Sequence, residues 1–203
     1  MLNLIDNTNF ISREKFKEEV EKSLKQTLSQ KELEKFENHN LKNSYFLLID
    51  IDRFQTINCE YGHDKGDKIL KRYFEEISNF FSNDYFEKNV YLSRVGGGDV
   101  AIFIKNLSFF NLKSFENFKN KINTILQEEN KKLFEKIKNK VEINHMPILT
   151  CSIGLTVIDN SYFKKDYHEI FITTDEALYK AKQLFRDRLE YREYPKDNYK
   201  IKK

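Results

Sequence analysis

The chain of 203 residues has no tryptophan, two prolines and two cysteines, and these shortages narrow its class. Cys59 and Cys151 do not have the spacing of metal ligands, so a reduced, cytoplasmic protein is the simplest interpretation. No apolar run approaches the ~20 residues of a membrane span. The N-terminus, MLNLIDNTNF, lacks the basic and then apolar pattern of a signal peptide. We therefore expect a cytoplasmic location.

An excess of one charge sign is also missing, because 35 Lys and Arg residues stand against 32 Asp and Glu residues. A net charge of +3 provides no broad basic field for duplex DNA or an anionic membrane. We therefore expect no nucleic acid and no membrane as partners. Hydrophobic residues make up 39% of the chain, with 18 Phe and 11 Tyr, which is enough for the core of one domain.

Apolar residues recur at helical spacing in four segments and form short strand-like runs in four others. The mixed order predicts an α/β protein of the α+β kind, with a central, mainly antiparallel sheet flanked by helices. We expect a single domain over 1–190, with an enlarged helical segment near 109–146, and a polar C-terminal tail over 191–203. The predicted helices are Ser12 to about Lys35, Lys65–Phe81, Phe115–Val141 and Asp175–Arg188, and the predicted strands are Tyr45–Asp52, VYLSRV, VAIFI and Pro147–Ile158.

Three of the six glycines stand together in the stretch SRVGGGDVAIFI, which runs from Ser93 to Ile104. Glycine tolerates positive φ and close backbone approach, and glycines between two apolar runs are a strong hairpin signal. The stretch therefore predicts a tight turn with Asp99 at its tip. Asp50 and Asp52 end the first predicted strand. If the two strands are neighbours, Asp50 and Asp99 converge at one edge of the sheet.

Convergent carboxylates bind hard divalent cations such as Mg²⁺ and leave room for substrate phosphates. Glycines beside them let a triphosphate approach the backbone. Lys182 and Arg186 are four residues apart in the last predicted helix, which places two phosphate-binding cations on one face. Together these features predict metal-assisted phosphoryl transfer.

Four stretches in the same order carry a resemblance to one family. LLIDIDRFQTINCEYGHDKGDKIL looks like the signature of GGDEF domains, the diguanylate cyclase family, and TNFISREKF, LTCSIGLTV and TDEALYKAKQLFRDR resemble its opening helix entry, penultimate strand and last helix. The resemblance runs from about Thr8 to Arg188. It implies a palm-like βαββαβ core. It also implies condensation of two GTP molecules into cyclic di-GMP, with one GTP per subunit of a transient homodimer.

The resemblance further implies a role for each residue that matches a family motif. Asp50, the Ile51 carbonyl and Asp99 would bind Mg²⁺ or Mn²⁺, and Asp99 would also be catalytic. Asn58 and Asp67 would bind the guanine edge, where a carboxylate can accept from both N1–H and the 2-amino group. The implied nucleotide-binding residues are Asn58, Asp67, Gly97, Gly98, Lys182 and Arg186, of which the last two would hold phosphates.

The hairpin departs from the family pattern. Aligned without a gap from Arg94, the signature positions read GGGDV, so Gly98 replaces the third-position acid and Asp99 the usual glutamate. A register shifted by one residue would restore the third-position acid and lose the fourth. The ungapped register keeps Arg94 and AIFI in family position, and we favour it. A second departure is Phe185, where the family has a small residue before the phosphate-binding arginine.

Three functions remain open at this point. The first is an active cyclase that uses GTP, at reduced activity. The second is a catalytically silent GGDEF domain that binds GTP or a related nucleotide and signals through a protein partner, and Gly98 favours it. The third is a related palm cyclase that makes another cyclic nucleotide from ATP. The shifted register favours the third, and Asn58 and Asp67 argue against it.

Overall fold

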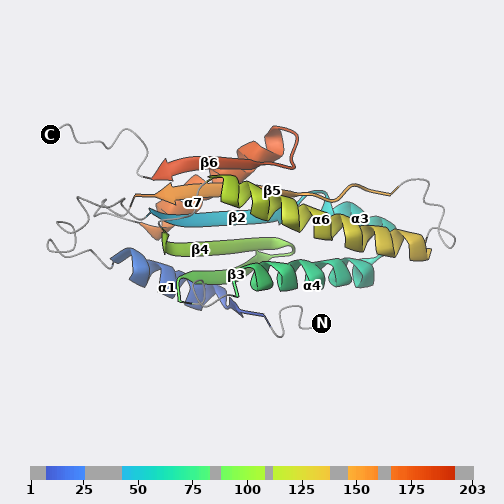
Figure 1. The fold of residues 1–203 in the computed structure, drawn as a ribbon, viewed down its shortest axis with the longest axis horizontal. Coiled ribbons are helices and arrows are strands. Elements are labelled where there is room, and N and C mark those ends of the chain that lie inside the picture. Colours follow the sequence, from blue (N-terminus) through green and yellow to red (C-terminus); the bar gives the residue numbers. More distant parts are fainter. Residues whose placement is uncertain are drawn as a thin grey trace.

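The structure is a computed structural model that describes residues 8–25, 43–82, 88–107, 112–137, 146–159 and 166–194. Figure 1 shows its helices packed around one sheet. The elements, in chain order, are β1 Phe10–Ile11, α1 Arg13–Lys25, β2 Asn43–Ile51, α3 Phe54–Tyr61, α4 His63–Phe80, β3 Val90–Gly96, β4 Asp99–Leu107, α6 Leu112–Ile137, β5 Cys151–Ile158, α7 Tyr167–Gln183 and β6 Leu189–Tyr194.

Six strands form this sheet in the order β1-β3-β4-β2-β5-β6. The inner pairs β3–β4, β4–β2 and β2–β5 are antiparallel. The outer pairs β1–β3 and β5–β6 are parallel. From β2 to β5 the chain therefore follows the βαββαβ order, and the prediction of a mainly antiparallel sheet flanked by helices is confirmed.

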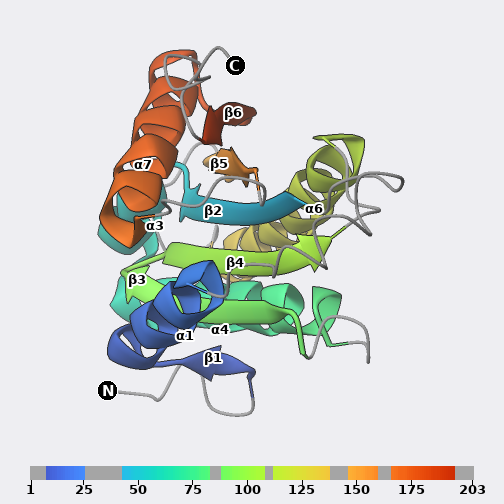
Figure 2. The ribbon, with the colours of Figure 1, turned by 90° about the vertical axis from the view of Figure 1, so that its left-hand side faces the viewer.

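Helices cover both faces of the sheet, so the central strand β2 is buried on both sides (Figure 2). Tyr45, Leu47 and Ile49 pack in the core under α4 and α6. Phe46 and Leu48, on the opposite face, pack in the core under α1 and α7. This alternation follows from the two-residue period of a strand. No helix in the described part of the chain is long and apolar enough to cross a membrane.

The first and third predicted helices agree with α1 and α6 where the structure describes them, whereas the last, predicted over Asp175–Arg188, is α7 over Tyr167–Gln183. Ser12 caps α1 as expected, since its Oγ accepts a hydrogen bond from the Lys15 backbone N–H at 3.2 Å. Beyond Lys25 the predicted first helix lies outside the described residues. The long segment 115–141 is the single helix α6 as far as Ile137, and residues 138–145 lie outside the described part.

Three elements were not predicted, and each has a weak pattern in the sequence. β1 has only two residues. α3 buries only Ile57 and Tyr61, which leaves little helical periodicity to detect. β6 reads LEYREY and pairs with β5 as far as Tyr194, so residues 191–194, which were expected in the tail, belong to the sheet. Residues 195–203 lie outside the described part.

α7 packs unusually closely onto β5 at Gly154. A Cβ at this glycine would lie 2.3 Å from the Thr174 carbonyl oxygen and 2.4 Å from the Leu178 backbone nitrogen. Next to this contact, the buried hydroxyls of Thr156 and Thr174 share a hydrogen bond of 2.7 Å. The helix backbone therefore lies directly against the strand, in a space that only glycine leaves free.

We expect Gly154→Ala to lower the free energy of unfolding by about 2–4 kcal/mol, because the added methyl group meets backbone atoms that cannot rotate away. Gly98→Ala is the matched control, since its Cβ would meet only side-chain atoms, the nearest at 3.3 Å. Urea unfolding followed by circular dichroism measures both variants. Equal losses in the two would contradict this account of the α7–β5 contact.

Candidate nucleotide-binding site

The structure brings Asp50 and Asp99 together, as the sequence predicted. Strands β2 and β4 pair Ile49 with Val100, so Asp50 and Asp99 are the next residues along adjacent strands. The pKa of Asp99 is raised to about 7. The main cause is the partial burial of its carboxyl group, and the hydrogen bond with Asp50 and the negative charge of Asp50 add to it. The protonated Asp99 carboxyl donates to the Asp50 carboxylate.

Lys182, from the last turn of α7, makes an ion pair with Asp50. Its Nζ lies 2.7 Å from Asp50 Oδ2, and the two side chains are 34% and 23% exposed. The ammonium group also lowers the pKa of Asp99, although the other influences outweigh it. The cation that was expected to hold phosphate therefore lies beside the acids that were expected to hold metal.

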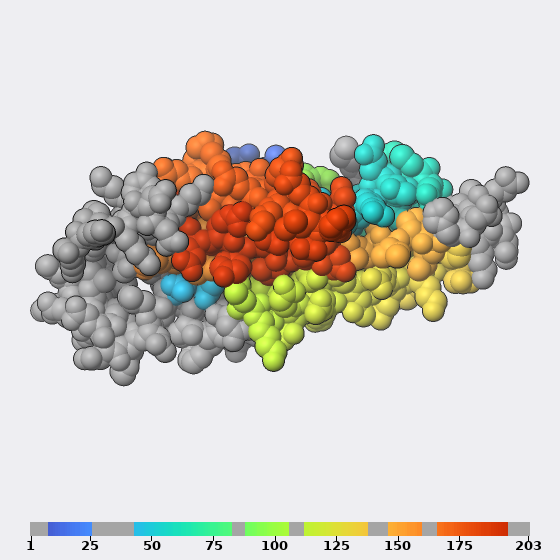
Figure 3. Space-filling model, turned by 90° about the horizontal axis from the view of Figure 1, so that it is seen from above, coloured from blue at the N-terminus to red at the C-terminus, as the bar shows by residue number. Residues whose placement is uncertain are grey.

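Asn58 and Asp67 come from different helices, and Asn58 packs against Gly66, the residue before Asp67. Asn58 lies in α3 and Asp67 in α4, and Gly62 separates the helices with φ +86°. A Cβ on Gly66, the residue before Asp67, would lie 2.0 Å from Asn58 Oδ1, so the Asn58 amide fills the space above Gly66. Asn58 thus lies against the helical turn of α4 that carries Asp67, and the joint binding of guanine by the two residues stays a prediction. Figure 3 shows α3 next to the end of α7 on the surface.

The prediction that Lys182 and Arg186 share one helix face is wrong. α7 ends at Gln183, and Phe185, Arg186 and Asp187 all have positive φ. The Arg186 backbone N–H bonds to the Ala181 carbonyl at 3.0 Å, which closes the helix and turns the chain toward β6. Arg186 therefore lies in the loop after α7 and not within the helix, as its spacing from Lys182 had suggested.

Comparison with known proteins decides the family. Residues 6–188 match the family model described as "Diguanylate cyclase, GGDEF domain". The chain belongs to the GGDEF domain family.

Curated relatives and solved structures agree with this assignment. Diguanylate cyclase DosC of Escherichia coli K12 is 30% identical over 145 residues, which cover 71% of this chain and 27% of DosC. The uncharacterized protein YtrP of Bacillus subtilis is also 30% identical over 145 residues, with 71% of this chain and 21% of YtrP covered. This GGDEF chain thus spans about a quarter of the length of these relatives or less.

Two solved structures share the fold. The coiled coil and GGDEF domain of DgcB from Caulobacter crescentus, in complex with c-di-GMP, superposes with a TM-score of 0.56 at 19% identity, covering 91% of this chain and 83% of that one. Diguanylate cyclase SiaD of Pseudomonas aeruginosa, in complex with its activator SiaC, gives 0.58 at 18% identity, covering 94% and 62%.

In this GGDEF domain the signature hairpin turns at Gly97 and Gly98. Gly96 pairs with Asp99, Gly97 has φ +41°, and Arg94 Nε donates to the Gly97 carbonyl at 3.0 Å. Gly98 is buried, and a Cβ there would lie 3.3 Å from Ile51 Cδ1 and 3.5 Å from Leu70. Gly98, which stands where the favoured alignment expects an acid, therefore faces apolar side chains.

The carboxylates of the GGDEF domain suit a cation that arrives with its substrate. Among the described residues, no group of three or more His, Cys, Asp or Glu side chains could hold a metal ion. Mg²⁺ is often bound through one or two carboxylates together with substrate phosphates. Asp50 and Asp99 fit that donor set, and the role expected for the Ile51 carbonyl stays a prediction.

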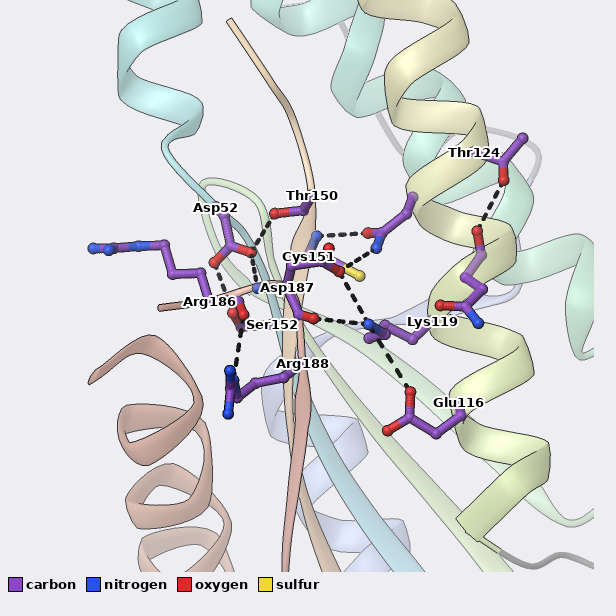
Figure 4. A network of polar contacts seen from close by, with 12 residues as sticks. Asp52, Glu116, Lys119, Thr124, Thr150, Cys151, Ser152, Arg186, Asp187 and Arg188 are labelled. Atoms are coloured by element: carbon purple, nitrogen blue, oxygen red, sulfur yellow. Dashed lines mark hydrogen bonds and ion pairs between the residues drawn. The ribbon is translucent and has the colours of Figure 1, made fainter. Parts of the chain in front are cut away.

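Asp52 has a structural role that the sequence did not reveal. It is 2% exposed and accepts hydrogen bonds from the hydroxyls of Thr150 and Ser152, each at 2.7 Å. Its Oδ2 also accepts from the Asp187 backbone N–H at 3.1 Å. Figure 4 shows this carboxylate between β5 and the loop after α7. The two acids at the end of β2 thus have different partners: Asp50 pairs with Lys182, and Asp52, directly after the strand, lies in a buried hydrogen-bond network.

The raised pKa of Asp99 predicts a pH effect on stability. Between pH 3.8 and about pH 7, Asp99 keeps its proton in the folded chain and has lost it in the unfolded chain. The free energy of unfolding therefore falls as the pH rises through this range. Without metal, we expect wild type to lose stability between about pH 4 and pH 7 more steeply than Asp99→Asn, which has no such proton. Urea unfolding in EDTA-treated buffer, repeated across this pH range, measures how the free energy of unfolding depends on pH in both proteins. An equal dependence would contradict a raised pKa of Asp99.

Proposed function

We propose that this GGDEF domain binds GTP with Mg²⁺ or Mn²⁺ and condenses two GTP molecules into cyclic di-GMP. The observation that carries the proposal is the meeting of Asp50, Asp99 and Lys182 at one end of the sheet. Asp50 Oδ2 and Lys182 Nζ are 2.7 Å apart, and burial, followed by the hydrogen bond and negative charge of the neighbouring Asp50, raises the pKa of Asp99 to about 7. Clustered groups with perturbed pKa values are typical of functional sites. A cytoplasmic location is part of this proposal.

Each side chain has a role in the proposed reaction. Asp50 and Asp99 hold the cation, which neutralises charge on the triphosphate and on the transferring phosphoryl group when it is bound. Lys182 exchanges its bond to Asp50 for a phosphate oxygen. Gly98 stands at the signature position whose acid would lie by the attacking 3′-hydroxyl, so Asp99 is the catalytic acid that remains in the hairpin, and its carboxylate accepts the proton of that hydroxyl. Asn58 and Asp67 bind the guanine edge.

The proposed product requires two sites. The 3′-oxygen of one GTP bonds to the α-phosphorus of the other and expels pyrophosphate, and a second such step closes the ring. With one GTP per chain, two chains must face each other, so we propose a transient homodimer as the active form. An active GGEEF domain of a Vibrio cholerae diguanylate cyclase shares the fold, with a TM-score of 0.52 at 23% identity.

A silent, nucleotide-binding domain is the second candidate. It is favoured by Gly98, which packs toward Ile51 and Leu70 and supplies no acid. In that case GTP binding would act through a protein partner, and the complex of SiaD with its activator SiaC shows that a diguanylate cyclase of this fold can have one. A cyclase that uses ATP is the third candidate, and the proposed binding of the guanine edge by Asn58 and Asp67 argues against it.

The guanine assignment predicts that Mg–GTP binds more tightly than Mg–ATP. Asp67→Ala removes an acceptor for buried donors and should cost about 1–3 kcal/mol of GTP affinity. Gly66→Ala should also weaken GTP binding, because its methyl group displaces the Asn58 amide, 2.0 Å away. Isothermal titration calorimetry measures these affinities, with Asp64→Ala, on the same helix, as the control. Equal GTP and ATP affinities that Asp67→Ala does not change would reject this pocket.

The catalytic assignment predicts slow formation of cyclic di-GMP from GTP that is lost in Asp99→Asn. Asp50→Asn should abolish the dependence of GTP binding on Mg²⁺, and Lys182→Ala should weaken GTP binding more than guanosine binding. Mass spectrometry of products from each nucleotide triphosphate decides among the three candidates. Turnover that survives Asp99→Asn would show that the catalytic acid lies elsewhere. GTP binding without any product would favour the silent domain.

A further inference from the structure

The backbone strain in this domain is concentrated around the hydrogen bond between the buried carboxylate of Asp52 and the backbone N–H of Asp187. Within the described residues, the non-glycine residues with positive φ are Arg53, Phe185, Arg186 and Asp187. Arg53 directly follows Asp52, and the other three form one run between α7 and β6. Both segments meet where Asp52 accepts the Asp187 backbone N–H. Such conformations persist only where the surrounding structure holds them, and they are often found at functional sites.

Asp187 is held on three sides. Its backbone N–H donates to Asp52 Oδ2 at 3.1 Å. Its Oδ1 accepts from Asn123 Nδ2 at 2.7 Å and from Lys119 Nζ at 3.0 Å, and its carbonyl accepts from Lys119 Nζ at 2.8 Å. Figure 4 shows these contacts converging from α6 on the right and from Asp52 on the left. Asp187 therefore connects α6 to the end of β2.

The two donors on α6 are themselves fixed. The Lys119 side chain is only 8% exposed, although lysine is seldom buried without a specific partner. Asn123 is also buried, and its Oδ1 accepts from the Cys151 backbone N–H at 2.7 Å, which ties it to the start of β5. Two buried polar side chains thus extend from a helix that contributes nothing else to the candidate site, and both end on Asp187.

Arg186 is the residue that this arrangement orients. It lies next to Asp187 within the strained run, and its backbone N–H is bound to the Ala181 carbonyl. Figure 4 shows the Arg186 side chain directed away from α6, on the opposite side of the loop from Lys119. A change in the backbone at Asp187 would therefore swing the guanidinium group.

We propose that Lys119 and Asn123 are positioning residues, which hold the 185–187 loop so that Arg186 reaches a triphosphate. The inference rests on the proposed function, because Arg186 is taken as a phosphate ligand. Lys119 and Asn123 act through Asp187 and touch no nucleotide. Their loss should therefore weaken the binding of phosphates and leave the binding of the guanine base unchanged.

The first test compares the binding of Mg–GTP and of guanosine by calorimetry. Lys119→Met should weaken GTP about tenfold, the loss expected for one charge-assisted hydrogen bond, and leave guanosine within about twofold. Added to Arg186→Ala, it should cause no further loss, because both changes remove the same contact. Asp187→Ala should behave like Lys119→Met, whereas Asp187→Asn should retain binding. Lys121→Met is the matched control, since Lys121 lies on the same helix and faces Glu76.

A second test needs no nucleotide. The chain has no tryptophan, and Phe185 is 90% exposed, so Phe185→Trp places a single tryptophan in the loop, whose fluorescence is excited selectively over that of the 11 tyrosines. Adding Lys119→Met should lower the fluorescence anisotropy of this tryptophan, and adding Lys121→Met should leave it unchanged. An unchanged anisotropy, additive losses with Arg186→Ala, or an equal loss of guanosine binding would each overturn the inference. If wild type binds no GTP, the proposed function fails, and the anisotropy alone decides whether Lys119 holds the loop.

Discussion

The close contact between α7 and β5 at Gly154 governs the geometry of the site. A helix normally stands off a sheet by the thickness of its side chains, but here the backbones of Thr174 and Leu178 lie where a Cβ of residue 154 would be. Because α7 lies so close to the sheet, Lys182, further along the same helix, reaches Asp50. It also brings the chain after Gln183 down to Asp52. The positions of both phosphate-binding candidates thus depend on one missing methyl group.

Electrostatic repulsion between two acids is the other governing constraint. Asp50 and Asp99 end adjacent strands, and their partial burial makes two negative charges costly. Three positive species can relieve this repulsion: a proton on Asp99, the ammonium group of Lys182, or a divalent cation. The folded chain uses the first two. In the proposed reaction a cation with its triphosphate would replace both, so substrate binding would release a proton and free a lysine.

The parts of the site that could be predicted rest on local patterns. The glycines of the hairpin and the acids after an apolar run are read directly from short stretches, and strand pairing brought Asp50 and Asp99 together as expected. Gly62 and Gly66 lie in the same signature as Asn58, and both contact it in the structure. Local signals suffice here because each feature spans only a few residues.

The parts that could not be predicted depend on distant contacts. Lys119 looks like one more lysine on a solvated helix face, and only the loop 68 residues later makes it a buried donor. The end of α7 was misplaced because the apolar pattern continues through Leu184, while the hydrogen bond from Arg186 to Ala181 ends the helix. β6 reads LEYREY, in which the charged residues Arg192 and Glu193 are consecutive and break the alternation of a strand, so its pairing with β5 at the edge of the sheet gives no strong pattern.

The central place of β2 also sets the order in which the chain can assemble. Ile49 of β2 pairs with Val100 of β4 on one side and with Ile153 of β5 on the other. Among the four inner strands β2 comes first in the sequence, so both of its partner strands are synthesised after it. Pairings between such distant segments slow folding, and an apolar strand without neighbours is prone to association with other chains. Until β5 has been synthesised, the segment from Asn43 to Ile51 therefore lacks the partner strand on one of its two sides. The candidate nucleotide-binding site, which needs α7 and Asp187, is completed last.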